Sequence, residues 1–132
     1  MLFDGEDDPS CAFACANLLV SGDNIEPDEF TRLFGTDPTE VDKAGDCTGW
    51  RLSSESQVRS TNLERHIHWV LDQIEDKRAV IATLKEERNC QIDLGCWWKG
   101  HPGTDENGPF LTTETVQRIG TFDLNLIFYS MR

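Results

Sequence analysis

The sequence predicts an α+β fold: a mostly antiparallel sheet of about four or five strands with helices packed on one face. Three observations support this prediction. An amphipathic helical pattern runs over residues 62–75, apolar stretches of strand length lie on both sides of it, and glycines and prolines separate these stretches. The expected element order is β-α-β-α-α-β-α-β. We expect residues 10–132 to form a single domain and the acidic residues 1–9 to form a flexible tail.

The first third of the chain predicts a buried strand followed by a short helix. Residues 11–20 form an almost continuous apolar run, which favours a buried strand, although periodicity alone also allows a helix. Residues 25–35 predict a helix, because a proline suits its first turn and a glycine suits its C-terminal cap. The polar residues 36–46 then predict a loop, and residues 49–53 predict a short strand.

The middle helix carries a complete apolar face. We expect Thr61 to cap its N-terminus and Glu64 to complete a capping box. Burying each large apolar side chain stabilises the helix by roughly 1.5–3 kcal/mol. Ordering each backbone residue costs roughly 1–2 kcal/mol, so the total cost is as large as the total gain or larger. The helix therefore needs a partner surface, which we expect to be the sheet. Its apolar residues are Leu63, Ile67, Val70, Leu71 and Ile74.

A second helix and an alternating strand follow the middle helix. Residues 77–89 predict a helix that a bend at 76–77 separates from the first, although one kinked helix would fit the same pattern. Residues 90–98 alternate between two faces, which is typical of a half-buried strand. Because Asp93 and Trp97 fall on the face opposite Ile92, we expect both to point away from the core.

The last part of the chain predicts one more helix and one more strand. Residues 99–109 form a loop rich in glycine and proline. Residues 112–120 predict a helix whose apolar face carries Val116 and Ile119, and residues 122–129 predict the closing strand.

Three segments together carry a resemblance to a known family. They are Gly-Trp-Arg-Leu at 49–52, the helix at 63–74, and the segment that runs from 110–120 on to Tyr129. In this order they resemble the bacterial domain-of-unknown-function family numbered 4279, over about residues 10–130. The resemblance implies the same α+β order of elements. It supplies no catalytic residue, and some members are associated with toxin-linked immunity genes.

Negative charge is concentrated near the N-terminus. The chain has a net charge of −12, and residues 1–46 hold 12 acidic residues against two basic ones. An acidic surface speeds encounter with a basic partner and opposes nucleic-acid binding. We therefore predict a non-enzymatic domain that binds a basic protein, in the manner of an immunity protein that blocks a nuclease-like toxin. The expected partner-binding residues are Asp23, Glu26, Asp28, Glu29, Asp37, Glu40, Asp42 and Trp97.

No motif predicts a metal, a cofactor or a catalytic centre. His66 and His68 are two residues apart on a predicted helix, so they point to different faces, with His66 bordering the core and His68 solvated. The five cysteines lack zinc-site spacing, and we expect only Cys47 to be exposed. An odd cysteine count, with neither a secretory leader nor a membrane-spanning apolar run, favours a cytoplasmic protein with reduced thiols that binds no membrane.

Two other functions stay open. One is a small-molecule-binding or hydrolytic domain, whose site would lie between the uncovered face of the sheet and the loop at 99–110, beside Asp93, Trp97 and His101. The other is a homodimer joined through that uncovered face.

Overall fold

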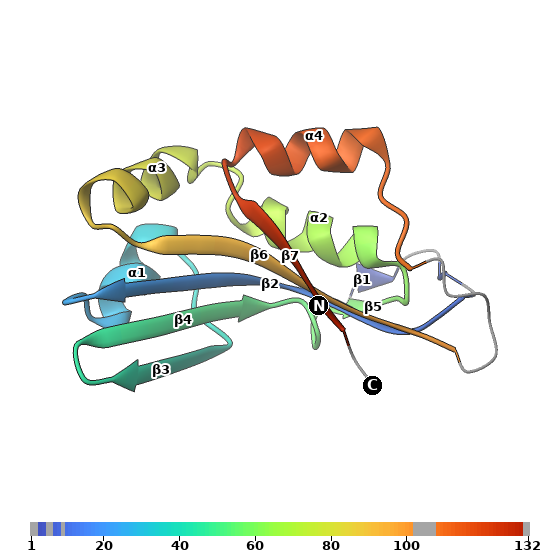
Figure 1. Ribbon diagram of the computed structural model, residues 1–132, viewed down its shortest axis with the longest axis horizontal. Coiled ribbons are helices and arrows are strands. Elements are labelled where there is room, and N and C mark those ends of the chain that lie inside the picture. The colour runs from blue at the N-terminus through green and yellow to red at the C-terminus, as the bar shows by residue number, and fades with distance from the viewer. Residues whose placement is uncertain (1–2, 5–6, 9, 102–107, 131–132) are drawn as a thin grey trace.

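The computed structural model describes residues 3–4, 7–8, 10–101 and 108–130. Its centre is a five-stranded sheet in the order β3-β4-β2-β6-β7 (Figure 1). Neighbouring strands are antiparallel except for β6 and β7, which are parallel. The fold is therefore α+β with a mostly antiparallel sheet, as predicted. The strands are β2 (Cys11–Asp23), β3 (Glu40–Ala44), β4 (Cys47–Ser53), β6 (Gln91–Gly100) and β7 (Asn125–Ser130).

Four helices accompany the sheet in the described part of the chain. In Figure 1, α1 and α2 lie behind the sheet, while α3 and α4 lie toward its β6 and β7 side. The side of the sheet that faces away from α1 and α2 is called the open face below. No described helix is long and apolar enough to cross a membrane. The helices are α1 (Pro27–Phe34), α2 (Leu63–Gln73), α3 (Arg78–Glu87) and α4 (Thr113–Thr121).

The hydrophobic core lies between the sheet and the helices. Strand alternation sends Leu18 and Leu94 into it from β2 and β6, where both are fully buried. Leu71 meets them from α2 and is also fully buried. On the β4 side, the rings of Phe34 and Trp50 stack with centroids 5.2 Å apart. The five apolar residues expected on the middle helix are all buried, so this helix packs as predicted.

The segment 36–46 is not the loop that its polarity predicts. Glu40–Ala44 is the strand β3, which pairs with β4 through a turn at Gly45. Gly45 has a φ of +63°, a conformation that a side chain would strain. All five residues of β3 are exposed because it is an edge strand. Edge strands commonly carry polar and charged side chains. The segment therefore has no alternation of apolar residues from which the strand could be predicted.

The N-terminus of α2 is capped differently from the prediction. Asn62, not Thr61, is the N-cap, and its side chain accepts a hydrogen bond from the Glu64 backbone N–H at 3.0 Å. The Thr61 hydroxyl instead donates to the Asp8 carbonyl at 3.0 Å. The Glu64 carboxylate does not fold back into a capping box. It accepts from the backbone N–H of Thr112 at 2.6 Å, which joins α2 to the start of α4.

The last helix and strand are shifted from their predicted positions. In α4 the buried residues are Thr115 and Ile119, whereas Val116 is 52% exposed. The prediction of a buried face was therefore right for Ile119 and wrong for Val116. Phe122 caps this helix and is buried there, and β7 begins only at Asn125. Asp123, with a φ of +57°, turns the chain between the end of the helix and this strand.

Part of the segment predicted as a tail is paired with the rest of the fold. Strand β1 (Phe3–Asp4) runs parallel to β5 (Val58–Arg59) in a separate two-stranded sheet. The Asp7 carboxylate accepts a hydrogen bond from the Thr61 backbone N–H at 2.9 Å. Strands β1 and β5 have two residues each, which is too short for a periodic pattern that the sequence could show.

Candidate functional site

The open face of the sheet is ordered by the strand registers. Leu19 on β2 lies opposite Asp93 on β6, and Asp93 lies opposite Asn125 on β7. Two residues further along β6, Gly95 lies opposite Ile127, and the next outward residue is Trp97. Because outward residues alternate with core residues, all of these side chains share one surface.

An acidic hollow of about 280 Å³ lies on this face. Two of its carboxylates come from Glu40 and Asp42 on the edge strand β3, and the third comes from Asp93 on β6. Arg51 forms an ion pair with Glu40 over 3.3 Å. The hollow therefore has more negative than positive groups. It is lined by Leu19, Val20, Ser21, Glu40, Asp42, Gly49, Trp50, Arg51, Gln91 and Asp93.

Asp93 is the most buried acid on the open face. Its side chain is only 4% exposed, and it accepts hydrogen bonds from the Gln91 amide at 2.9 Å and the Asn125 amide at 3.2 Å. Within the described part of the chain it forms no ion pair. Amide donors satisfy its oxygens without neutralising its charge, so a cation brought to this hollow would be held favourably.

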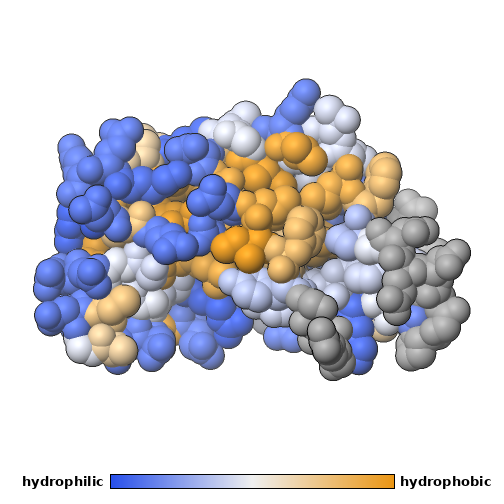
Figure 2. All heavy atoms as spheres, in the orientation of Figure 1, coloured by the Kyte–Doolittle hydropathy of each residue, from blue (hydrophilic) through white to orange (hydrophobic). Residues whose placement is uncertain are grey.

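The other end of the open face is aromatic. The rings of Trp97 and Tyr129 stack with centroids 4.3 Å apart and an angle of 9° between their planes. They lean over Gly95, where an added Cβ would lie 3.1 Å from each ring and 2.8 Å from a methyl group of Leu19. Figure 2, which views the open face, shows hydrophobic residues gathered in its middle and hydrophilic residues toward the end where β3 turns into β4.

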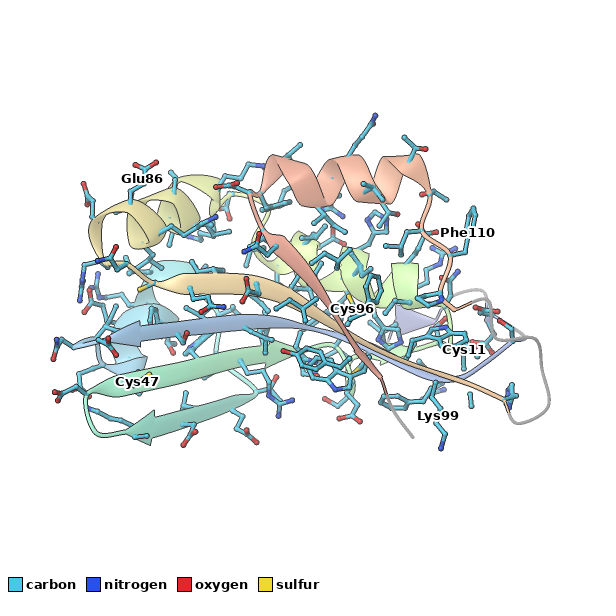
Figure 3. All side chains as sticks on the ribbon, viewed as in Figure 1. Cys11, Cys47, Glu86, Cys96, Lys99 and Phe110 are labelled. Carbon is cyan, nitrogen blue, oxygen red and sulfur yellow. The ribbon has the colours of Figure 1, made fainter. Side chains whose placement is uncertain are left out.

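Exposed aromatic residues continue this surface past the β7 edge. A hollow of about 370 Å³ is lined by Trp98, Pro109, Phe128 and Tyr129. Phe110 is 77% exposed and projects from the segment before α4 (Figure 3). The open face thus changes from acidic near β3 to aromatic near β7, and aromatic residues are enriched in protein-binding surfaces.

Only part of the predicted acidic surface reaches the open face. Glu40 and Asp42 do so, and Asp37 lies on the connection before β3. The others surround the start of α1, where Glu26 pairs with Lys43 at 2.6 Å and Glu29 pairs with Arg88 at 2.8 Å. The predicted acids in this second group are Asp23, Glu26, Asp28 and Glu29.

The cysteines behave as the sequence predicts. Cys11, Cys15, Cys90 and Cys96 are buried and free, and Cys47 is exposed near the turn between β3 and β4 (Figure 3). Burial raises the pKa of Cys15 to about 11 and that of Cys96 to about 12, so neither thiol is activated. In the described ranges, no three His, Cys, Asp or Glu side chains are grouped to hold a metal ion.

The two neighbouring histidines on α2 serve different contacts. His66 is buried, with Nδ1 2.7 Å from the Ser54 hydroxyl and Nε2 2.7 Å from the Ser60 carbonyl oxygen. A ring nitrogen beside a carbonyl must donate, so Nδ1 accepts from Ser54. Burial lowers the pKa of His66, which the hydrogen bond to Ser60 only partly opposes. His68 was expected in solvent, but it hydrogen-bonds to residues of α4 instead.

The residues expected to form a small-molecule site are spread apart. Asp93 lines the acidic hollow, whereas Trp97 belongs to the aromatic pair beyond Gly95. His101 is exposed after the end of β6. Residues 102–107 of the predicted loop lie outside the described residues.

Sequence reasoning missed two features of this surface. It did not place Asp93 beside Glu40 and Asp42, because β3 was not recognised and its pairing with β4 decides that arrangement. It also did not stack Tyr129 on Trp97, which follows from the parallel register of β6 and β7. The alternation of residues along β6 and β7 was the signal that could have indicated which side chains point outward.

Comparison with known proteins places the chain in a family. No curated protein and no solved structure matches it. A family model described as a domain of unknown function, DUF4279, matches residues 12–129. This match covers nearly the same residues as the resemblance found in the sequence. The chain belongs to the DUF4279 family of domains of unknown function.

Proposed function

We propose that this protein is a non-enzymatic binding domain whose open face recognises a basic protein, in the manner of an immunity protein that blocks a nuclease-like toxin. The observation that carries the proposal is Asp93, a carboxylate that is 4% exposed and sits in a hollow with Glu40 and Asp42. An arginine or lysine of the partner entering this hollow would supply the missing positive charge.

The charge of the whole chain supports the same partner. A net charge of −12 attracts basic proteins over long range and repels nucleic acids. The aromatic residues beside the hollow, chiefly Trp97 and Tyr129, provide the apolar contact area that protein interfaces need. Since all five cysteines are free, we place this function in the cytoplasm, where thiols stay reduced.

The experiment is a binding measurement with the product of the neighbouring gene, made at low and at high salt. We expect Asp42→Asn and Asp93→Asn each to weaken binding by about tenfold, because each removes one negative charge from the hollow. Asp28→Asn is the matched control, since Asp28 is an exposed acid on α1 away from the hollow. Binding that is unchanged by salt, or weakened equally by all three variants, would contradict the proposal.

A homodimer through the open face is a second candidate, favoured by the apolar residues near β7. Tyr129 is 38% exposed on this face and stacks on Trp97. Light scattering at two protein concentrations distinguishes this candidate. A dimer that Tyr129→Ser converts to a monomer would support it, whereas a monomer at both concentrations would exclude it.

A further inference from the structure

A polar pocket lies away from the acidic hollow, and the proposed function does not use it. Its volume is about 440 Å³. Three segments meet there: the connection from α1 to β3, the end of β4 with the turn that follows, and the helix α2. The pocket is lined by Thr36, Asp37, Pro38, Thr39, Leu52, Ser53, Ser56, Gln57, Trp69 and Gln73.

Hydrogen bonds hold two walls of this pocket together. The Thr39 backbone N–H donates to the Arg51 carbonyl at 2.7 Å, and the Ser53 backbone N–H donates to the Thr39 hydroxyl at 2.9 Å. These bonds fasten the connection after α1 to strand β4. The pocket therefore has a defined shape before any ligand binds, which reduces the entropy lost on binding.

The third wall is fixed through a buried histidine. The Ser54 hydroxyl, in the turn after β4, donates to Nδ1 of His66 on α2 over 2.7 Å. Trp69 and Gln73 lie three and seven residues after His66, on the same side of that helix. The bond between Ser54 and His66 thus positions the turn against the part of α2 that lines the pocket.

Several polar side chains in the pocket have unused hydrogen-bonding capacity. The side chains of Thr36, Asp37 and Gln73 form no hydrogen bond with any other described residue. The indole of Trp69 packs against the core, and its remaining surface lines the pocket. An amide, a hydroxyl and a carboxylate therefore line the same pocket as one aromatic ring.

We propose that this pocket binds a neutral, hydroxyl-rich ligand of the size of one sugar ring. The apolar C–H groups of a sugar fit against an aromatic ring, and its hydroxyls pair with amide and carboxylate groups. A single carboxylate and a net charge of −12 oppose an anionic ligand. The polar lining disfavours a wholly apolar one. This inference is independent of the proposed function, and it assigns Asp37 to a different site from Glu40 and Asp42.

The test follows the Trp69 indole N–H by nuclear magnetic resonance, with its signal assigned through Trp69→Phe. The probes are the methyl glycosides of glucose, galactose and N-acetylglucosamine, at millimolar concentrations, with N-acetylarginine amide and inorganic phosphate as charged probes. We expect at least one glycoside to shift this signal saturably, and neither charged probe to do so.

Two variants make the result specific to the pocket. Gln73→Ala should weaken glycoside binding about fivefold or more, because it removes a free amide. Gln117→Ala, an exposed glutamine on α4, is the matched control and should bind as the wild type does. The inference is overturned if no glycoside shifts the signal, if Gln73→Ala and Gln117→Ala bind equally well, or if only the arginine probe binds.

Discussion

Arg118 on α4 donates a hydrogen bond from its guanidinium to Nδ1 of His68 on α2 over 2.8 Å. An arginine has no acceptor, so Nδ1 must accept and the ring proton lies on Nε2, which is 3.0 Å from the Thr115 hydroxyl. The same guanidinium pairs with Asp72 at 2.7 Å and with Glu75 at 2.8 Å. One arginine therefore joins the last helix to two side chains of α2 and to Glu75, which follows the end of that helix.

Arg118→Met should weaken the attachment of α4 to α2. The expected loss is about 1–2 kcal/mol, because a charge-assisted hydrogen bond is lost together with two solvent-screened ion pairs. Urea unfolding measures it as a lower midpoint with an unchanged slope. Arg32→Met is the matched control, because Arg32 is an exposed residue of α1. This variant should leave the midpoint unchanged. Equal midpoints for the two variants would show that Arg118 does not stabilise this contact.

Stability should fall on acidification because of His66. Burial lowers the pKa of His66 in the folded protein, so below about pH 6.5 the unfolded chain binds a proton that the folded chain does not. This contribution to the unfolding free energy is complete above that pH and is lost progressively below it. Unfolding measured between about pH 7.5 and pH 5 should show the decline.

His66→Gln separates this effect from other acid-sensitive groups. The variant should be less stable at neutral pH by about 1–3 kcal/mol, since the Ser54 hydroxyl and the Ser60 carbonyl lose their partner. Its stability should also depend less steeply on pH. Parallel pH curves for the wild type and His66→Gln would contradict the assignment.

The two apolar residues of α4 should respond very differently to truncation. Ile119 is 4% exposed, so Ile119→Ala should cost about 2–4 kcal/mol. Val116 faces solvent, so Val116→Ala should change stability by less than about 0.5 kcal/mol. Thermal unfolding of both variants checks the orientation of the helix. A large loss for Val116→Ala would mean that this side chain is covered in solution.

The aromatic pair on the open face requires a glycine beneath it. Gly95→Ala should destabilise the fold by about 1–3 kcal/mol, because the new methyl group would push aside Leu19 and the rings of Trp97 and Tyr129. The near-ultraviolet circular dichroism of the pair should change as well. Gly120→Ala is the control, since an added Cβ there meets nothing within 4 Å and improves helix propensity. If both variants have the same melting temperature, the rings do not cover Gly95 closely.

Local periodicity made much of the fold predictable. The apolar spacing of residues 62–75 and the alternation of residues 90–98 both follow from backbone geometry, which is the same in every protein. The family segments and the free, mostly buried cysteines were likewise evident in the residues themselves.

The candidate site was predictable only in part. The sequence indicated that Trp97 and Asp93 point away from the core, and that acidic residues dominate the first third. It could not place Glu40 and Asp42 near Asp93, because Asp42 lies 49 positions before Gln91, the start of the strand that carries Asp93. Only the pairing of β3, β4, β2 and β6 brings these carboxylates to one hollow.

By itself, the sequence determined which segments form the helices and the central strands, because those segments carry their own hydrophobic pattern. The tertiary structure decided the pairing of the polar edge strand β3, the exposure of Val116, and which acids share a surface. These features depend on neighbours that are distant in the chain, and a side chain is buried or exposed only with respect to the element that packs against it.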